Sequence, residues 1–447
     1  MEKYKPIIDD WQAFKQEAEE HPVNAVRKNP PKSGPEFEER LGERFEYEQA
    51  DWNSDIYRIQ TETPGKSLLH WRGEYYVQEE SAALPVEVLD PRPREKILDM
   101  CAAPGGKTTQ IAAKMNNKGL VVANDESGQR MKSLHANVYR TASVIADATN
   151  YDARFLPEER FDRILVDAPC SGEGDRYRET FEAVDEQDSR GLADLQFQLL
   201  EKASKMVKED GTVVYSTCTI TPLENEAVVD RAVEETGLEL VDIETEIEHV
   251  RGVNSFEELE LDYEMEKTVR VYPHHLNSGA IFVAKFRKNI SSGPEELNPD
   301  SSQRSELEDK GLNYLEERFG VAVDELEGLK LVERHDDLWL ASEQSTEYDA
   351  ETRGIRALRA TGIGLKPTTY LLQYLDEELS KKVVEISDEE CEKLLARKDM
   401  IPRDMNEEGY VALKYDDRVL GCGFYKNEKV SSRIPKGRSK ELLKALF

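Results

Sequence analysis

Two of the five cysteines stand at the ends of apolar segments that read as strands. Cys170 ends the segment 161–170, within DAPCSG, and Cys218 ends the segment 212–218, within YSTCT. A lone cysteine is more often a small core residue than a reactive one. If the two segments are neighbouring parallel strands, however, their ends lie about 5 Å apart and both thiols face one crevice.

The chemistry open to such a pair is covalent catalysis, because a thiolate is a strong nucleophile. The acceptor that gains most is a pyrimidine. Its C5 atom is a poor nucleophile until another group adds at C6, and thiolate addition at C6 creates an enamine that can attack a methyl group. The two cysteines therefore favour methyl transfer to a pyrimidine base.

A turn of small residues follows the predicted strand 96–100 and precedes a predicted helix. It consists of Cys101, Ala102, Ala103, Pro104, Gly105, Gly106 and Lys107. Small side chains at the start of a helix let a ligand approach the backbone closely. A Walker A loop needs glycine five residues before Gly106, where Cys101 stands, and no GxGxxG is present. The turn therefore predicts a cofactor loop that binds neither a nucleoside triphosphate nor a dinucleotide.

Three acids close consecutive predicted strands: Asp125, Asp147 and Asp167. Ligands of open α/β sheets lie beyond the carboxyl ends of the strands, where an acid can bind ribose hydroxyls. The alternative is that each acid merely caps a helix. Three of them beside one small-residue turn favour the cofactor. Ribose and adenine recognition without a phosphate-binding motif indicates S-adenosylmethionine.

The elements that must position these residues alternate along the chain. Strands are predicted at 96–100, 120–125, 142–148, 161–170, 212–218 and 280–286, with helices at 108–115, 127–140, 192–207 and 224–235. Alternation of this kind predicts an α/β fold with a mostly parallel sheet covered on both faces.

The flanking regions differ from this pattern. Residues 1–90 are acidic with one basic cluster, Arg27, Lys28 and Lys32; residues 289–310 are rich in serine, proline and acids and read as a linker. Residues 311–447 form a further unit, in which 409–427 alternates like a β-hairpin. Seven Lys/Arg and two acids follow from 426 to 447, a local charge of +5 that is either a solvated helix face or a phosphate-facing patch. The candidate contacts are Arg433, Lys436, Arg438 and Lys440.

The whole chain is strongly acidic. Its 447 residues carry 91 Asp/Glu and 60 Lys/Arg, a net charge of −31. That charge opposes binding of a nucleic acid, unless the protein is adapted to high salt, where the Debye length is only about 3 Å. We favour the halophilic interpretation. No apolar run of membrane-spanning length, signal-like N-terminus or CxxC pair is found, so we expect a cytoplasmic protein with no membrane partner and no metal.

The motifs CAAPGGKT, DAPCSGEG and YSTCT with its trailing ENEAV resemble those of the RNA (cytosine-C5) methyltransferases of the NOL1/NOP2/Sun family. The resemblance covers about residues 20–288. The segments 355–367 and 433–439 are similar to the PUA-like RNA-binding tail of bacterial members that modify small-subunit rRNA. This implies a small N-terminal α+β domain (1–90), a class I, Rossmann-like methyltransferase domain (91–288), the linker, and a PUA-like domain (311–447).

The resemblance also implies roles for single residues. Cys218 matches the nucleophile and Cys170 the cysteine that helps to release product. The turn 101–107 with Asp125, Asp147 and Asp167 matches the S-adenosylmethionine site. Asp167 also lies near the cytosine edge, and Lys107 could orient the substrate. The segment VRKNPPK departs from the usual family pattern by its two prolines. The pair His274 and His275 matches the family's PH segment and reads as structural or RNA-facing, not as a metal site.

The function implied is S-adenosylmethionine-dependent methylation of cytosine C5 in structured RNA, through a bond between Cys218 and C6, by a monomer. We favour rRNA as the substrate over tRNA. A DNA cytosine methyltransferase is one alternative, and it would use Cys170 as nucleophile. A non-catalytic RNA-binding factor of ribosome assembly is the other, and the intact Cys170, Cys218 and Lys107 weigh against it.

Overall fold

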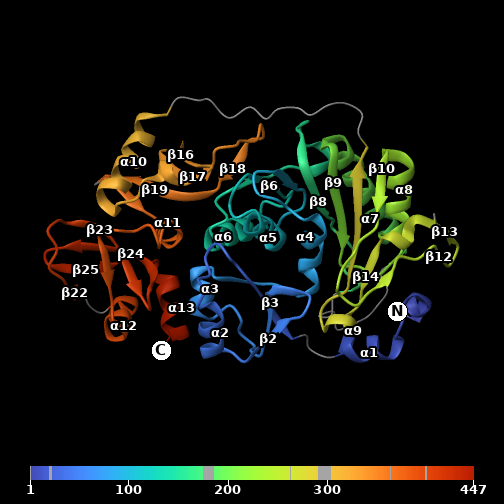
Figure 1. The fold of residues 1–447 in the computed structure, drawn as a ribbon, viewed down its shortest axis with the longest axis horizontal. Helices are drawn as coiled ribbons and strands as arrows, with labels where there is room; N and C mark the ends of the chain where they lie inside the picture. The colour runs from blue at the N-terminus through green and yellow to red at the C-terminus, as the bar shows by residue number, and fades with distance from the viewer. Residues whose placement is uncertain are drawn as a thin grey trace.

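The computed structural model describes residues 2–19, 23–174, 186–261, 263–289, 304–362, 364–397 and 400–446. Most of the predicted linker, residues 290–303, lies outside them. Figure 1 shows three parts along the chain: an N-terminal part in blue, a large central sheet with its helices, and a C-terminal part in orange and red.

The N-terminal part is a small α+β unit. Its antiparallel sheet has the order β2-β3-β1-β4, and the apolar side chains of Val26, Tyr57 and Leu41 form its core. Its elements are β1 (Asn24–Lys28), α2 (Phe37–Arg44), β2 (Tyr47–Ala50), β3 (Asn53–Ile59), α3 (Leu68–Arg72) and β4 (Tyr75–Val77). The helices on either side of this unit, α1 (Trp11–Glu19) and α4 (Leu84–Leu89), pack instead against the central part of the chain.

The central sheet holds the predicted alternation. Its parallel strands have the order β9-β8-β5-β6-β7. Strands β6 and β7 are added on one side of β5, and β8 and β9 on the other, so the strand order reverses between β5 and β8. In open α/β sheets the ligand lies at this switch point. The elements are β5 (Lys96–Asp99), α5 (Gly106–Lys114), β6 (Leu120–Asn124), α6 (Met131–Thr141), β7 (Ala146–Thr149), β8 (Phe161–Asp167), α7 (Glu186–Met206), β9 (Val207–Thr217) and α8 (Glu226–Thr236).

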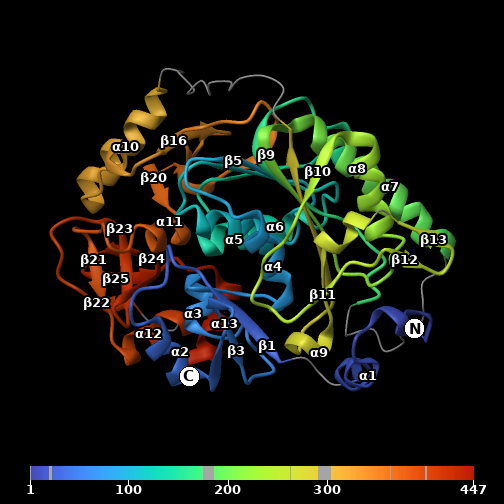
Figure 2. The same ribbon diagram turned by 45° about the vertical axis from the view of Figure 1, so that its right-hand side comes forward.

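Side chains of each strand alternate between two apolar cores, one on each face of the sheet. Ile97 of β5 packs with Ile111 and Leu134 of α5 and α6, while its neighbour Leu98 packs with Leu200 of α7. Figure 2 shows α7 and α8 side by side, away from α5 and α6. The sheet is therefore covered on both faces, as the alternation of strands and helices predicts.

Antiparallel strands complete one edge of this sheet. β15 (Ile281–Lys288) pairs with β9, and β14 (Val269–Val271) and β10 (Leu238–Val241) pair with β15. The remaining elements here are β11 (Val250–Arg251), β12 (Ser255–Phe256), β13 (Leu259–Glu260) and α9 (Pro273–Leu276).

The C-terminal part begins with α10 (Glu306–Phe319), so the predicted linker extends too far. Ser305 caps this helix, and the side chain of Glu308 returns to the Ser305 backbone, which starts the helix before residue 310. A sheet of order β16-β17-β19-β20 follows. The elements are β16 (Leu329–Arg334), β17 (Asp337–Ser342), β18 (Ala350–Arg353), β19 (Ile355–Thr361), β20 (Gly364–Pro367) and α11 (Thr369–Tyr374).

One strand of the C-terminal part, β18, does not join the sheet β16-β17-β19-β20. It pairs antiparallel with β7 of the central sheet. The central sheet thus continues into a segment 200 residues further along the chain.

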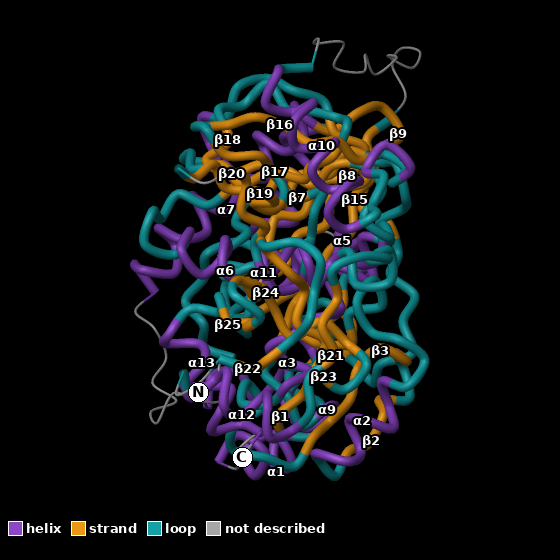
Figure 3. Tube along the Cα trace, turned by 90° about the vertical axis from the view of Figure 1, so that its left-hand side faces the viewer, coloured by secondary structure: helices purple, strands orange, loops and turns teal. Residues whose placement is uncertain are grey.

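The last sheet has the order β21-β23-β24-β25-β22 and includes the predicted hairpin, formed by β23 and β24. Its helix α13 packs against α3 of the N-terminal part, and Figure 3 shows both at the same end of the molecule. The elements are β21 (Val383–Glu385), α12 (Asp388–Ala396), β22 (Ile401–Pro402), β23 (Gly409–Tyr415), β24 (Arg418–Lys426), β25 (Lys429–Ser432) and α13 (Lys436–Leu446). Among the described helices, none is both long and apolar enough to cross a membrane.

Candidate active site

The two cysteines meet at the ends of neighbouring strands. β8 ends at Asp167 and β9 at Thr217, and the two strands pair in parallel. The Sγ atoms of Cys170 and Cys218 lie 3.0 Å apart. Cys218 is exposed and Cys170 is half-buried. The expectation that both thiols face one crevice agrees with this geometry.

The surroundings of Cys170 change the pKa of its thiol. The hydrogen bond with Cys218 and burial together raise the pKa of Cys170 well above its ordinary value. Cys170 therefore keeps its proton and can donate it in a hydrogen bond to the sulfur of Cys218. This leaves the exposed Cys218 as the thiol that a substrate can reach.

Two buried side chains hold the cysteine loops in place. Glu224 accepts hydrogen bonds through Oε2 from the Ser171 backbone (3.0 Å) and from the Gln196 amide (2.9 Å). Asn225 accepts from the Thr217 hydroxyl (2.5 Å) and donates to the Thr219 carbonyl (3.0 Å). Neither residue was predicted to have a role, although both belong to the segment ENEAV that carries the family resemblance. The fold buries both completely.

Lys107 and Asp167 form an ion pair beside the thiols. Lys107 Nζ lies 2.7 Å from Asp167 Oδ2, and the Ser216 hydroxyl donates to Asp167 Oδ1 at 2.7 Å. Burial disfavours the charge on Lys107, but Asp167 outweighs it and raises the pKa of the ammonium group, with a further contribution from the nearby Cys218. A fixed positive charge and a partly exposed carboxylate thus border the crevice.

The small-residue turn forms a tight loop before α5. Gly105 has φ = +106°, a conformation that favours glycine, and a Cβ atom there would lie 3.0 Å from the Leu134 side chain. The Asp125 carboxylate accepts hydrogen bonds from the backbone of Ala103 (3.1 Å) and Ser127 (3.0 Å). Asp125 is therefore placed beside the loop as predicted, and it shapes the loop directly.

One buried acid beside the loop supports a cofactor site. Asp99 ends β5 and accepts a hydrogen bond from the Thr108 hydroxyl at 2.7 Å through Oδ2, while Oδ1 is buried without a partner. Burial raises the pKa of Asp99 to about 7. A buried carboxylate oxygen that has no hydrogen-bond partner, such as Asp99 Oδ1, can accept a hydrogen bond from the amino group of a ligand. S-adenosylmethionine carries such an amino group.

The placement of Asp147 differs from the expectation. β7 runs from Ala146 to Thr149, so Asp147 lies inside the strand and is completely buried. Its carboxylate accepts from the Arg353 guanidinium and the Gly354 backbone, each at 3.2 Å. The acid that follows the end of β7 is Asp152, which is one-third exposed and caps the turn at residues 153–155.

The predicted basic cluster of the N-terminal part is largely buried. Arg27 donates to the Gly106 carbonyl (3.2 Å) and the Thr109 hydroxyl (2.9 Å), so it supports the cofactor loop from behind. Lys32 is enclosed between the three parts, where burial lowers its pKa to about 7. Lys28 is half-buried, with Nζ 5.3 Å from the centre of the Phe37 ring. RNA contact by Arg27 and Lys32 was therefore a wrong prediction, because charge alone does not report burial.

The candidates of the C-terminal end are placed differently. Arg433, Lys436, Arg438 and Lys440 are all exposed, in or just before α13. The Arg433 guanidinium lies 4.9 Å from the centre of the Phe424 ring. These four side chains are open to a partner, and their contact with RNA stays a prediction.

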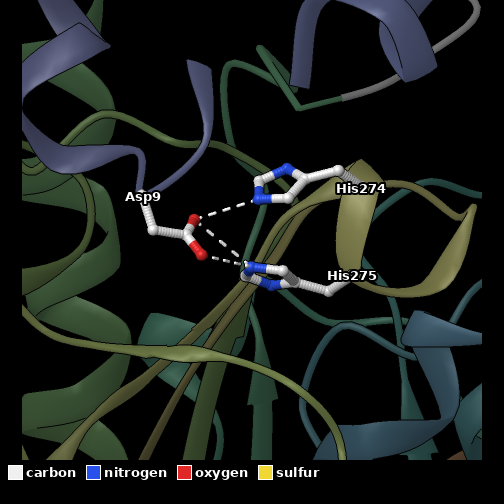
Figure 4. A group of neighbouring side chains, drawn as sticks. All are labelled: Asp9, His274 and His275. Carbon is white, nitrogen blue, oxygen red and sulfur yellow. Dashed lines mark hydrogen bonds and ion pairs between the residues drawn. The ribbon is translucent and has the colours of Figure 1, made fainter. Parts of the chain in front are cut away.

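The His274–His275 pair contacts Asp9 of the N-terminal part (Figure 4). His274 Nε2 lies 3.0 Å from Asp9 Oδ1, and His275 Nε2 lies 3.1 Å from Asp9 Oδ2. The Tyr272 backbone donates to His275 Nδ1 at 3.1 Å. A neutral His275 then carries its proton on Nε2 and donates it to Asp9, which favours a hydrogen-bonded structural role over metal ligation.

Comparisons with known proteins agree with this architecture. The family model described as 16S rRNA methyltransferase RsmB/F matches residues 86–287, and the one described as the RsmF PUA domain matches residues 381–439. The chain is 30% identical to a ribosomal RNA small subunit methyltransferase F of Vibrio atlanticus, over 88% of this chain and 85% of that protein. It is 32% identical to the protein of that name from Aeromonas salmonicida, over 83% and 80%.

Solved structures give the same result for the fold. A methyltransferase homologue from Pyrococcus horikoshii superposes with a TM-score of 0.56 at 29% identity, over 62% of this chain and 90% of that one. The crystal structure of NSun6 from the same organism superposes with a TM-score of 0.54 at 22% identity, over 65% and 97%.

Proposed function

Since the chain belongs to the RsmB/F family of 16S rRNA methyltransferases, we propose that it methylates C5 of a cytosine in small-subunit rRNA through a covalent bond between Cys218 and C6. We infer that it does so as a monomer in the cytoplasm. The observation that carries the proposal is the pair of thiols 3.0 Å apart, beside the Lys107–Asp167 ion pair and next to the cofactor loop.

S-adenosylmethionine is the methyl donor of this family and supplies an electrophilic methyl group when bound. The residues placed to hold it are the loop 101–107 and the acids around it, Asp99, Asp125 and Asp152. Asp147 lies inside β7, completely buried and paired with Arg353, and its contact with the cofactor stays a prediction.

The target cytosine has to leave its stack before C6 is accessible. The Cys218 thiolate then attacks C6, so that a carbon–sulfur bond forms and electron density moves onto the ring. Asp167 accepts hydrogen bonds from the amino edge of the base. The Lys107 ammonium, 2.7 Å from that carboxylate, stabilises the negative charge that develops on the ring.

The activated C5 would take the methyl group, with the demethylated cofactor as the leaving group, and would then lose its proton to a base. The carbon–sulfur bond breaks, the C5–C6 double bond reforms, and the electron pair returns to the sulfur of Cys218. Cys170 keeps its proton and hydrogen-bonds to Cys218. It can therefore stabilise the departing thiolate, which is the assistance that the family resemblance implies.

Transfer of labelled methyl groups to separated rRNA and tRNA tests this function. The RNA comes from cells that lack the gene, and the assay contains molar KCl. We expect label in small-subunit rRNA as 5-methylcytosine. Label in tRNA alone would keep the chemistry but replace the substrate. A folded protein that labels neither RNA would support the non-catalytic RNA-binding factor instead.

A further inference from the structure

A cavity of about 330 Å³ lies where the three parts of the chain meet, outside the crevice that holds the thiols. Its walls come from α3, α6, α11 and α13 and from the loop before α3. The side chains that matter for its chemistry are Lys66, His70, Asn137, Arg140, Tyr370 and Arg438.

Arg140 is a half-buried cation at this cavity that lacks an acidic partner. Its guanidinium donates to the carbonyls of His70 (3.3 Å) and Tyr75 (3.0 Å) and to the Asn137 Oδ1 atom (3.0 Å). Within the described part of the chain, no carboxylate forms an ion pair with it. In a protein of net charge −31, this half-buried guanidinium is held only by neutral acceptors and by the Tyr76 ring, 5.5 Å from Cζ, so its charge is left for an anion to neutralise.

The other charges of the cavity are also mainly positive. Lys66 and Arg438 line it and are exposed, and the single carboxylate in the lining is Glu441, 2.8 Å from Arg438. His70 adds no charge, because burial and the two arginines lower its pKa to about 3. Three cations from three parts of the chain therefore face one carboxylate.

We propose that this cavity binds a backbone phosphate of the substrate RNA, with Arg140 and Arg438 as its main ligands and Lys66 at the rim. This rests on the proposed function for the class of substrate. Two guanidinium groups suit phosphate, because each offers paired donors. The half-buried Tyr370 ring provides a flat wall for the adjoining sugar or base.

The cavity is connected to the cofactor loop by one side chain. Asn137 accepts from Arg140 and donates to the Pro104 carbonyl at 2.9 Å. A phosphate held at Arg140 therefore lies two side chains away from the loop that precedes α5. An RNA strand bound in the cavity is fixed next to the crevice, so the site positions RNA and takes no part in the chemistry.

The test compares two variants of one helix, Arg438→Gln and Lys444→Gln. Each removes one positive charge from an exposed side chain of α13. Positions six residues apart point about 120° apart around a helix, and of the two only Arg438 lines the cavity. Affinity for small-subunit rRNA is measured at the lowest KCl concentration that keeps the wild type folded. We expect R438Q to weaken binding about tenfold and to lower the salt slope by about 0.7–0.9, and K444Q to change binding less than twofold.

A third variant, Glu441→Gln, removes the carboxylate that competes with phosphate. We expect it to strengthen RNA binding about threefold, a result that loss of folding cannot produce. Equal losses in R438Q and K444Q, or no gain in E441Q, would overturn the proposal in favour of a general electrostatic effect. Methyl transfer by the wild type is measured on the same RNA, so that a failure of the proposed function is seen separately from a failure of the phosphate site.

Discussion

At the scale of single residues, the two thiols differ in exposure although only 3.0 Å separates them. The exposed Cys218 is accessible to C6 of a base, and the protonated Cys170 is a donor to its sulfur. This difference is consistent with the proposal that Cys218 attacks the base and Cys170 assists its release.

Replacement of Cys170 by alanine should therefore trap the intermediate. We expect a covalent protein–RNA adduct that survives a denaturing gel, together with at least a hundredfold loss of turnover. Cys218→Ala should give neither adduct nor methyl transfer. Cys422→Ala, at a buried cysteine of β24, is the control. Normal turnover of C170A without an adduct would contradict the role given to Cys170.

The positions that sequence alone could predict are those set by local structure. Cys170, Cys218, Lys107 and Asp125 come after strands whose ends are readable from apolar runs, and their roles stay predictions. The place of Asp147 inside β7 was not foreseen, because its partner, Arg353, lies 206 positions away in the sequence. The burial of Arg27 and Lys32 likewise depends on packing between distant segments, which the type of residue does not reveal.

At the scale of elements, the cofactor loop depends on one backbone conformation. Gly105→Ala places a side chain at φ = +106° and 3.0 Å from Leu134. We expect a loss of about 1–3 kcal/mol of stability, measured by denaturant unfolding without cofactor. Gly106→Ala is the matched control, because its Cβ would meet Tyr76 at an ordinary 3.4 Å and its backbone is unstrained. Equal effects in both variants would show that backbone strain is not the cause.

The Arg353–Asp147 ion pair joins β18 to β7 and gives a pH-dependent prediction. Burial raises the pKa of Asp147 to about 6, so the folded state binds more protons than the unfolded one, and stability falls as the pH rises from about 4 through 6. Removing Arg353 leaves the carboxylate unpaired and raises this pKa further.

We expect Arg353→Ala to cost about 3–5 kcal/mol at pH 8 and clearly less at pH 5, where Asp147 is protonated in the variant. Unfolding by urea at both pH values measures the difference. The double variant with Asp147→Asn should recover part of the loss at pH 8. A cost that is the same at both pH values would mean that the ion pair is not its source.

The elements themselves were predictable where apolar runs are continuous. The central strands and helices fall close to their expected positions, but β7 begins at Ala146 and not at residue 142. Residues 142–145 instead form turns stabilised by hydrogen bonds such as Ser143 to the Val138 carbonyl. A short apolar run cannot by itself distinguish such a turn from a strand.

At the scale of the whole molecule, the net charge of −31 sets the conditions for folding. Like charges repel one another in dilute buffer, and salt screens them. We expect the midpoint of thermal unfolding and the methyl-transfer rate to rise together as KCl increases from 0.1 M toward molar concentrations. An uncharged osmolyte at equal osmolality is the control. Full activity in dilute buffer would contradict the halophilic interpretation.

The class of the fold could be predicted from the alternation of strands and helices, and the PUA-like end from its motifs. The way in which the parts join could not. Trp71 of α3 donates to the Leu420 carbonyl at 3.0 Å, and β18 pairs with β7. Such contacts involve ordinary residues with no distinctive spacing, so they are visible only in the folded chain.

The pairing of β18 with β7 also determines when the central sheet gains its last edge strand during synthesis. Until residue 353 leaves the ribosome, about 200 residues after β7, that strand is an open edge with unpaired backbone groups. Open edges recruit strands from other chains. A nascent or truncated chain that ends before β18 is therefore exposed to aggregation through β7, and the C-terminal part serves as the cover of the catalytic sheet.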